Sequence, residues 1–319
     1  MIIGIIVVTL ILLAISVCIA SFYACFYAPN KVAADPYGPV HSEQAEEFKD
    51  QIYENTRRME EVEFETVTIR SFDGLQLFGR YYHQKDGAPV QILFHGYRSM
   101  ALRDCAGGFL LAQKMGFNIL VVDQRAHGNS EGHVITLGIF ERRDCQSWIR
   151  YINERFGKET PIILSGTSMG AATVVMATAL PMPDNVLCVI ADSPYTSPGE
   201  ILKEYCNQRF IPTWIVYPFI KMAARFLGGF NLEQSSAIEG VGVSAIPILL
   251  IHGDDDRLVP CTMSAKLHEL SNDCTKLKLF MGADHCLSYI IEPHLYERAV
   301  RDFLKQFPAL EEYIATAEV

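Results

Sequence analysis

The chain is short of basic residues and has no paired-cysteine motif. Its 319 residues carry 27 lysines and arginines against 37 aspartates and glutamates, for a formal charge of −10. This charge argues against nucleic-acid binding, which requires a basic surface. The cysteines beyond residue 27 are odd in number and lack C-x-x-C spacing, which argues against a disulfide framework and a zinc site. We therefore expect free thiols in a reducing compartment. The cysteines concerned are Cys105, Cys145, Cys188, Cys206, Cys261, Cys274 and Cys286.

Charge is also missing from the first part of the chain. Residues 1–27 contain no charged side chain, and about twenty such apolar residues are enough to cross a bilayer. We predict a transmembrane anchor over residues 1–27, with Tyr23, Phe26 and Tyr27 at the membrane interface. A cleaved signal peptide is the alternative, but it would need a basic start, a shorter apolar core and a small-x-small site. Lys31 follows the span, which favours a single-pass cell-membrane protein whose main domain is cytoplasmic.

Residues 28–61 form a polar connector between the apolar span and the rest of the chain. A linker that contains proline and glycine comes first, and residues 41–60 are expected to form an amphipathic helix. Acidic residues lie in its first turn, and Arg57 and Arg58 lie in its last turn, which suits the helix dipole. This helix either packs on the following domain or holds it away from the membrane.

From residue 62 onward, short apolar strands alternate with helices. Such alternation predicts an α/β fold with a mostly parallel sheet of about eight strands and helices on both faces. Ligands of such sheets bind beyond the carboxyl ends of the strands. The expected strands lie in residues 62–70, 75–83, 90–96, 118–125, 161–166, 185–194, 246–256 and 276–285.

A serine between two glycines stands where a strand meets a helix. The stretch LSGTSMGAAT places Ser168 after the apolar run of residues 161–166 and before a run of small residues. This is the pattern of the G-x-S-x-G turn, which exposes a nucleophilic serine on a strained backbone. Gly166 and Gly170 are expected because larger side chains two residues away from the serine would clash.

A serine hydroxyl needs a base to take its proton, and the base needs an orienting carboxylate. His285 follows the last predicted strand, and Asp256 follows the strand before it, so the order along the chain is serine, aspartate, histidine. We predict His285 as general base and then general acid, and Asp256 as the carboxylate that holds its tautomer. Asp254 and Asp255 in the same loop, and Asp192 at another strand end, are the alternatives to Asp256.

An oxyanion that forms at this serine would need backbone N–H donors. Met169 directly follows the serine at a helix N-terminus, and Tyr97 lies in the loop after the third predicted strand, so we predict their amides as an oxyanion hole. His95 at the end of that strand is expected to be structural. His127 and His133 are six residues apart without further ligands in a metal spacing, so a hydrogen-bonded turn is expected there rather than a metal site.

Five motifs together resemble the α/β-hydrolases, and in particular bacterial hydrolases of the serine-aminopeptidase-like and esterase/lipase-like kind. The resemblance covers residues 62–307 and implies the α/β-hydrolase fold. In the family pattern HG-x-x-D-x-x-V-P the acid of the triad falls on Asp256. The family often has glycine before its histidine, where this chain has Asp284. The motifs are FHGYRS, DQRAHGNSEG, GTSMGAA, IHGDDDRLVP and GADHCLSY.

The resemblance also implies a catalytic domain over residues 62–319, with a helical cap inserted at about residues 194–243. The cap segment is rich in tryptophan, tyrosine, phenylalanine and methionine, so an apolar or aromatic acyl group is the expected substrate part. We expect a serine hydrolase of small-molecule carboxylic esters that uses no metal or organic cofactor. An aminopeptidase that binds the substrate amine at Glu200 and Glu204, an acyltransferase, and a non-catalytic binding protein are the alternatives. The sequence does not predict the oligomeric state.

Overall fold

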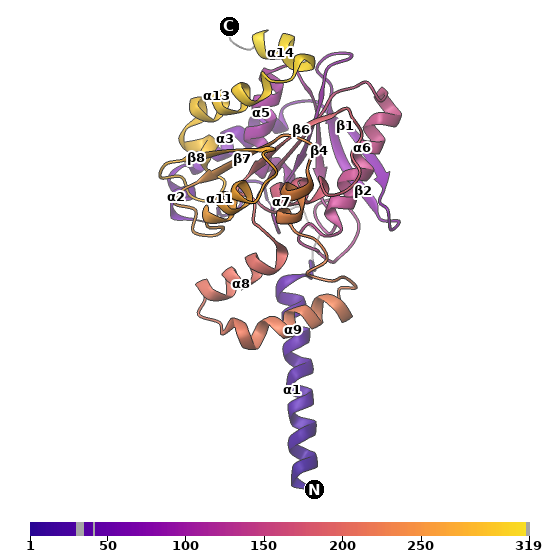
Figure 1. Ribbon diagram of the computed structural model, residues 1–319, viewed down its shortest axis with the longest axis vertical. Coiled ribbons are helices and arrows are strands. Elements are labelled where there is room, and N and C mark those ends of the chain that lie inside the picture. The colour runs from indigo at the N-terminus through magenta and orange to yellow at the C-terminus, as the bar shows by residue number, and fades with distance from the viewer. Residues whose placement is uncertain (30–34, 41, 317–319) are drawn as a thin grey trace.

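The sheet at the centre of the protein has eight strands in the order β1-β2-β4-β3-β5-β6-β7-β8 (Figure 1). The computed structural model describes residues 1–29, 35–40 and 42–316. β1 and β2 pair antiparallel, β2 pairs antiparallel with β4, and the remaining neighbours are parallel. The predicted fold, with a mostly parallel sheet, is confirmed.

The strands coincide with the apolar runs of the sequence to within a few residues. Their bounds are β1 Glu65–Arg70, β2 Gln76–Tyr82, β3 Val90–Phe94, β4 Asn118–Asp123, β5 Ile162–Thr167, β6 Val186–Asp192, β7 Ile248–Gly253 and β8 Thr275–Phe280. The helices are α1 Ile2–Cys25, α2 Glu43–Glu47, α3 Lys49–Glu60, α4 Ala101–Asp104, α5 Ala106–Lys114, α6 Glu141–Phe156, α7 Met169–Ala177, α8 Pro198–Gln208, α9 Thr213–Phe226, α10 Ala237–Val243, α11 Thr262–Glu269, α12 Ser288–Ile291, α13 Pro293–Leu304 and α14 Glu311–Thr316.

Two hydrophobic cores cover the two faces of this sheet. One contains Trp148 of α6 and Val174 of α7, and the other contains Phe109 of α5 and Phe303 of α13. Strands covered on both faces must be apolar at successive positions, and every residue of β3, β4 and β7 is buried. This burial explains why these strands read as continuous apolar runs in the sequence.

The predicted helix over residues 41–60 is broken in two by the structure. Ser42 caps the first helix by accepting a hydrogen bond from the Ala45 amide at 3.1 Å, and Phe48 separates α2 from α3. α3 packs against α4 and α5 and buries Met59, so this segment covers the domain. Much of the predicted linker before it, including Lys31, lies outside the described residues.

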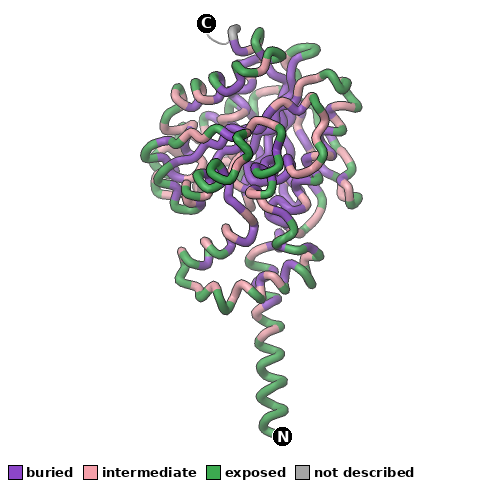
Figure 2. The backbone as a smooth tube through the Cα atoms, viewed as in Figure 1, coloured by how far each residue is buried: buried purple, intermediate pink, exposed green. Residues whose placement is uncertain are grey.

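The N-terminal helix α1 projects from the rest of the protein (Figure 1). By length and composition it could cross a membrane, although a signal sequence would pass the same test. Its exposed part ends where it meets the helix α9, and Cys18, Ser21 and Phe22 are buried there (Figure 2).

The segment that follows α1 is docked on the domain. The amide of Ala28 donates to the carbonyl of His133 at 2.9 Å, and the amide of Ile135 donates to the carbonyl of Phe26 at 2.8 Å. The Phe26 ring is fully buried and packs edge-on against Phe230, with centroids 5.2 Å apart. The helix therefore leaves the domain from a fixed point, which its charge-free sequence did not predict.

Candidate active site

Ser168 lies on the turn between β5 and α7, beyond the carboxyl end of its strand. Its backbone is left-handed, with φ 54° and ψ −117°, a conformation that costs free energy in residues other than glycine. The Ser168 amide donates to the carbonyl of Asp192 at 2.8 Å, which ties the turn to the end of β6.

The two flanking glycines allow this turn to pack closely. A Cβ atom on Gly166 would stand 2.3 Å from the carbonyl carbon of Gly170, and one on Gly170 would stand 2.1 Å from the carbonyl oxygen of Phe94. Both contacts are with backbone atoms, which cannot turn away as a flexible side chain could. The turn thus needs glycine at both positions, as the sequence pattern indicated.

Replacement of Gly170 by alanine is expected to destabilise the protein by about 3 kcal/mol or more, because the new methyl group overlaps backbone of β3. Gly242→Ala is the matched control, since Gly242 is an exposed residue of α10 with no neighbour within 4 Å of the added Cβ. That control is expected to keep or raise stability by up to about 1 kcal/mol. Urea denaturation of both variants measures the difference, and equal stability would contradict the packing described for the turn.

The structure brings Ser168, His285 and Asp256 into one hydrogen-bonded chain. Ser168 Oγ lies 2.9 Å from His285 Nε2, and His285 Nδ1 lies 2.6 Å from Asp256 Oδ2. Since an ionised carboxylate only accepts, Nδ1 carries the proton and Nε2 accepts from the serine hydroxyl. The Asp256 side chain is fully buried, whereas His285 keeps 17% of its side chain exposed. The three side chains come from loops after β5, β7 and β8.

The groups around these three side chains keep Asp256 charged and make His285 a stronger base. Burial raises the pKa of Asp256, but hydrogen bonds from His252 and His285 outweigh burial and hold that pKa well below its usual range. Burial lowers the pKa of His285, but the hydrogen bond and charge of Asp256, with smaller contributions from Asp192 and Asp104, raise it above its ordinary value.

A second histidine, His252, holds the same carboxylate and was not predicted as part of the site. Its Nε2 lies 2.8 Å from the carbonyl oxygen of Val259 and 3.1 Å from Asp256 Oδ2. A carbonyl only accepts, so Nε2 carries the proton, and Nδ1 accepts from the Ser264 hydroxyl at 2.7 Å. Asp256 Oδ1 also accepts from the amides of Leu258 and Val259 at 2.9 and 2.7 Å. The carboxylate is thereby fixed in direction.

The alternative aspartates are bound elsewhere. Asp254 accepts from the Gly282 amide at 2.6 Å, Asp255 pairs with Arg257 at 3.2 Å, and Asp192 is bonded to the Ser193 hydroxyl at 3.1 Å. Burial raises the pKa of Asp192 to about 6. None of these three carboxylates is hydrogen-bonded to His285 among the described residues. Asp284 accepts from the amides of Arg257 and His285 at 3.1 and 2.8 Å, so it holds the loop of the histidine.

The predicted oxyanion donors, the amides of Tyr97 and Met169, lie in segments that adjoin the serine. Met169 begins α7, and a Cβ on Gly96, the residue before Tyr97, would stand 3.4 Å from Ser168 Cβ. Within the described ranges neither amide donates a hydrogen bond to the protein. Both N–H groups therefore have spare donor capacity, which the predicted oxyanion hole requires.

Asp104 shapes the loop that carries Tyr97, a role that no pattern in the sequence indicates. Its Oδ2 accepts from the Gly96 amide at 2.8 Å, and its Oδ1 accepts from the Ser99 hydroxyl at 2.6 Å. Arg98 in the same loop has φ 49°, and its amide donates to His127 Nε2 at 3.0 Å. The loop thus keeps its strained shape through side-chain hydrogen bonds from two other segments.

The other histidines of this region have structural partners. His95 Nδ1 donates to the carbonyl of Gly96 at 2.8 Å, and its Nε2 accepts from the Gln124 amide at 3.0 Å. His133 packs in a stacked arrangement against the Tyr27 ring with centroids 6.0 Å apart. Across residues 1–29, 35–40 and 42–316, no cluster of three or more His, Cys, Asp or Glu side chains is arranged to hold a metal ion.

The pH dependence of activity follows from the state of His285, which can act as a base only when neutral. Its pKa stands above the ordinary value of 6.5, so kcat/KM is expected to fall about tenfold per pH unit below a midpoint above pH 6.5. Initial rates with a soluble ester from pH 5 to 9 measure this midpoint. In kcat/KM the midpoint gives the pKa of the base in the free enzyme. A flat profile down to pH 5 would contradict the assignment of His285 as the base.

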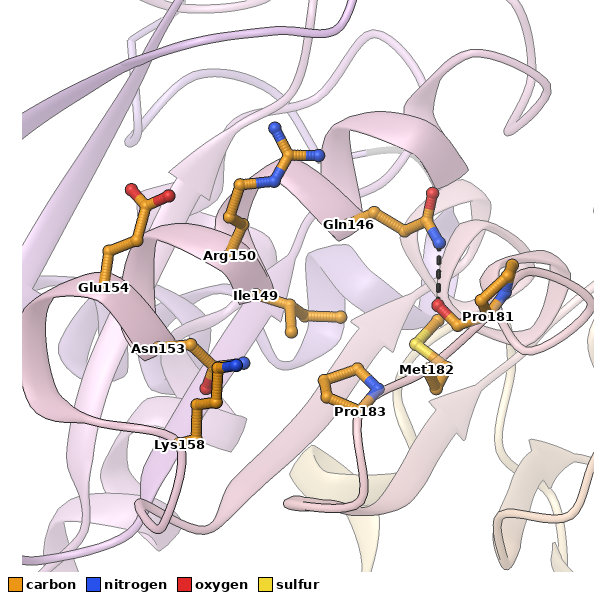
Figure 3. A pocket seen from close by; sticks show the side chains of 9 residues that line it. All are labelled: Gln146, Ile149, Arg150, Asn153, Glu154, Lys158, Pro181, Met182 and Pro183. Atoms are coloured by element: carbon orange, nitrogen blue, oxygen red, sulfur yellow. Dashed lines mark hydrogen bonds between the residues drawn. The ribbon is translucent and has the colours of Figure 1, made fainter.

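A surface hollow of about 440 Å³ is lined by none of the three residues Ser168, Asp256 and His285 (Figure 3). It is formed by α6 and the loop before β6, where Gln146 donates to the carbonyl of Pro181 at 2.9 Å. Its charged lining does not suit an apolar acyl group. The hollow is therefore no part of the site. Its lining residues are Gln146, Ile149, Arg150, Asn153, Glu154, Lys158, Pro181, Met182 and Pro183.

Known proteins are similar to this chain in sequence and in fold. The family described as serine aminopeptidase S33 matches residues 88–235. The uncharacterized protein YqkD of Bacillus subtilis is 25% identical over 254 residues, which cover 79% of this chain and 82% of YqkD. The lysophosphatidylserine lipase ABHD12 of Danio rerio is 26% identical over 175 residues, 51% of this chain and 42% of that protein. The chain thus aligns with less than half of the zebrafish lipase.

A solved esterase has the same fold. The Pyrococcus furiosus esterase Pf2001 superposes with a TM-score of 0.63 at 23% identity, over 88% of this chain and 98% of the esterase. With the sheet order described above, these likenesses show that the chain has the α/β-hydrolase fold. The likeness to these proteins supports a hydrolase, and its activity is the subject of the proposal that follows.

Proposed function

We propose that the protein is a membrane-anchored serine hydrolase that cleaves carboxylic esters with an apolar or aromatic acyl group. The observation that carries the proposal is the unbroken hydrogen-bonded chain from Ser168 through His285 to the buried Asp256, built on a turn with positive φ. Backbone strain of this kind persists only where the surrounding structure enforces it, which is typical of catalytic serines. The likeness to Pf2001 and to the zebrafish lipase supports an ester rather than an amide substrate.

The geometry supports a two-step reaction through an acyl-enzyme. Ser168 Oγ attacks the ester carbonyl while His285 Nε2 takes its proton, and Asp256 stabilises the resulting imidazolium. The amides of Tyr97 and Met169 donate to the oxyanion of the tetrahedral intermediate. His285 then returns the proton to the departing alcohol, which leaves Ser168 acylated. A water molecule activated by His285 repeats the sequence, releases the carboxylic acid and restores the serine.

A serine aminopeptidase is the second candidate, because the matching family carries that description. It would need a free carboxylate for the amine of the substrate, for which Glu200 and Glu204 are the candidates. Glu200 pairs with Lys266 at 2.9 Å and bonds to Thr196, while Glu204 accepts from Gln208 at 3.2 Å. Because Lys266 already neutralises Glu200, the ester is the better supported substrate.

A substrate panel separates these candidates. We expect p-nitrophenyl esters to be hydrolysed with kcat/KM rising from short to medium acyl chains, and aminoacyl p-nitroanilides to be cleaved at least about a hundredfold more slowly. Faster cleavage of the anilides would overturn the ester assignment. Addition of an alcohol tests the acyltransferase alternative, since a transferase would form a new ester in place of the free acid. A binding protein without activity would turn over none of these substrates.

We propose that α1 anchors the protein in the cell membrane, with the catalytic domain on the cytoplasmic side. The apolar composition of α1 supports a membrane span, and its docking through Phe26 and Ala28 suits a helix that is kept rather than cleaved. An impermeant maleimide tests the side, because the partly exposed Cys261 should be labelled only after cells are permeabilised. Labelling of intact cells would place the domain outside.

A further inference from the structure

The cap helix α9 carries large apolar residues on both of its sides, with the exposed Arg225 among those of the outer side. Its inner side buries Ile220, Ala223 and Ala224 against α1 and the domain. Its outer side exposes large apolar residues that share a face, because residues four, seven and eight apart lie on one side of a helix. A soluble helix would carry polar residues on that outer side. The outer residues are Trp214, Ile215, Met222 and Phe226.

Phe210 and Leu227, which flank this helix in the chain, are exposed apolar residues too. Phe210 is 96% exposed with φ 55°, an unfavourable backbone conformation for an aromatic residue, and Trp214 is 81% exposed. Phe226 is 75% exposed. An area of this kind on a water-soluble surface marks an interaction site. We define the cap surface as Phe210, Trp214, Ile215, Met222, Phe226 and Leu227.

The position of the cap surface relative to α1 indicates what covers the cap surface. α8 and α9 form the layer between the sheet and the projecting part of α1, and α9 runs across α1 (Figure 1). A bilayer that surrounds the projecting part of α1 would therefore meet α9 along its length. Both helices expose large apolar residues, and the exposed length of α1 ends where α1 meets α9 (Figure 2).

The length of α1 leads to the same conclusion. Cys18 is its first buried residue, and the part before it rises only about 24 Å at about 1.5 Å per residue. The hydrocarbon core of a bilayer is about 30 Å thick. A helix that crosses the whole core must therefore draw its contact with α9 into the boundary between headgroups and acyl chains. Tryptophan is enriched at this boundary, and interfacial helices bury tryptophan and phenylalanine of their apolar face in it.

We propose that the cap surface docks into the interfacial layer of the bilayer that holds α1, and that the site takes its ester from that leaflet. This inference rests on the proposed membrane span and esterase function. The loop of the oxyanion donors lies at the base of α1, where Tyr97 donates to the Cys25 carbonyl at 2.9 Å and Arg98 donates to the Tyr23 and Tyr27 carbonyls at 3.0 and 2.9 Å. The substrate class is therefore a lipid ester, whose acyl chain is already in the membrane.

Tryptophan fluorescence tests the docking without any catalysis. The chain has two tryptophans, and Trp148 is buried, so the difference between the wild type and Trp214→Phe reports on Trp214 alone. The full chain is placed in phosphatidylcholine vesicles whose lipids carry bromine near either the headgroup end or the methyl end of the acyl chain. We expect stronger quenching of Trp214 by the shallow bromine, and little quenching by aqueous iodide.

Two results would overturn the docking. Quenching by iodide but not by brominated lipid would place Trp214 in water, and protection from both would mean that protein, such as a second copy of the chain, covers it. Because this measurement needs no substrate, it can fail while the esterase proposal stands, and it can succeed when no ester is cleaved.

A second set of variants tests the source of the substrate. Joint replacement of Phe210, Trp214 and Phe226 by serine is expected to lower hydrolysis of a monoacylglycerol in vesicles about tenfold or more. Cleavage of soluble p-nitrophenyl butyrate should stay within about twofold, because these residues are outside the reacting site. Leu270→Ser is the control, since this 46% exposed residue follows α11 near the opposite end of β8. Equal loss on both substrates, or on neither, would overturn uptake from the leaflet.

Discussion

Ser168→Ala is expected to lower kcat for p-nitrophenyl esters by about 10⁵-fold or more. The loss is this large because the other groups of the site serve a nucleophile that is then absent. Alanine tolerates the positive φ of residue 168 no worse than serine does, so the thermal midpoint of unfolding should not fall. A fluorophosphonate probe that labels the wild type should leave this variant unlabelled.

Ser165→Ala is the matched control for that experiment. Ser165 is a buried serine of β5 only three residues away, with no bond to His285 among the described residues. The control should keep both its turnover and its fluorophosphonate label. Labelling that persists in Ser168→Ala would identify another nucleophile and contradict the proposed reaction.

Asp256→Asn is expected to lower kcat by about 10⁴-fold. The amide would donate to His285 Nδ1 instead of accepting from it, which turns the ring to the tautomer that cannot take the serine proton. Without the charge that raises the pKa of His285, burial would lower that pKa, so the acid limb of the remaining activity should move to lower pH. Rates over the same pH range as for the wild type measure both effects.

The neighbouring aspartates provide the controls for Asp256. Asp255→Asn removes only an exposed pair with Arg257, so kcat should stay within about twofold. Asp192→Asn probes the alternative acid at the end of β6, and we expect a smaller loss because its carboxylate acts on His285 only through space. A loss at Asp192 that exceeds the loss at Asp256 would reverse the assignment of the acid.

The sequence predicts the sheet well because its strands are buried on both faces. The apolar runs of β3, β5 and β7 end at polar residues, and parallel strands bring those ends to one edge of the sheet. This rule alone groups Ser168, Asp256 and His285, which the structure places within hydrogen-bonding distance of one another. Their catalytic roles stay a proposal until the variants are measured.

Other parts of the site could not be predicted, because they depend on contacts between distant segments. His252 occupies an interior strand position, and only its burial beside Asp256 makes it a partner of the carboxylate. Asp104 lies in a short helix, with no local pattern to connect it to the Gly96 amide. The docking of α1 through Phe26 could not be predicted either, because the sequence of an apolar span does not show whether its end packs on a domain.

The most direct test of the account is mass spectrometry of the enzyme during turnover. The wild type is mixed with a p-nitrophenyl ester, quenched with acid within the first turnover, and digested to peptides. We predict that the acyl group is found on Ser168, and that no acylated peptide forms in Ser168→Ala. Turnover without any acylated residue, or an acyl group carried by a different side chain, would contradict the proposed acyl-enzyme.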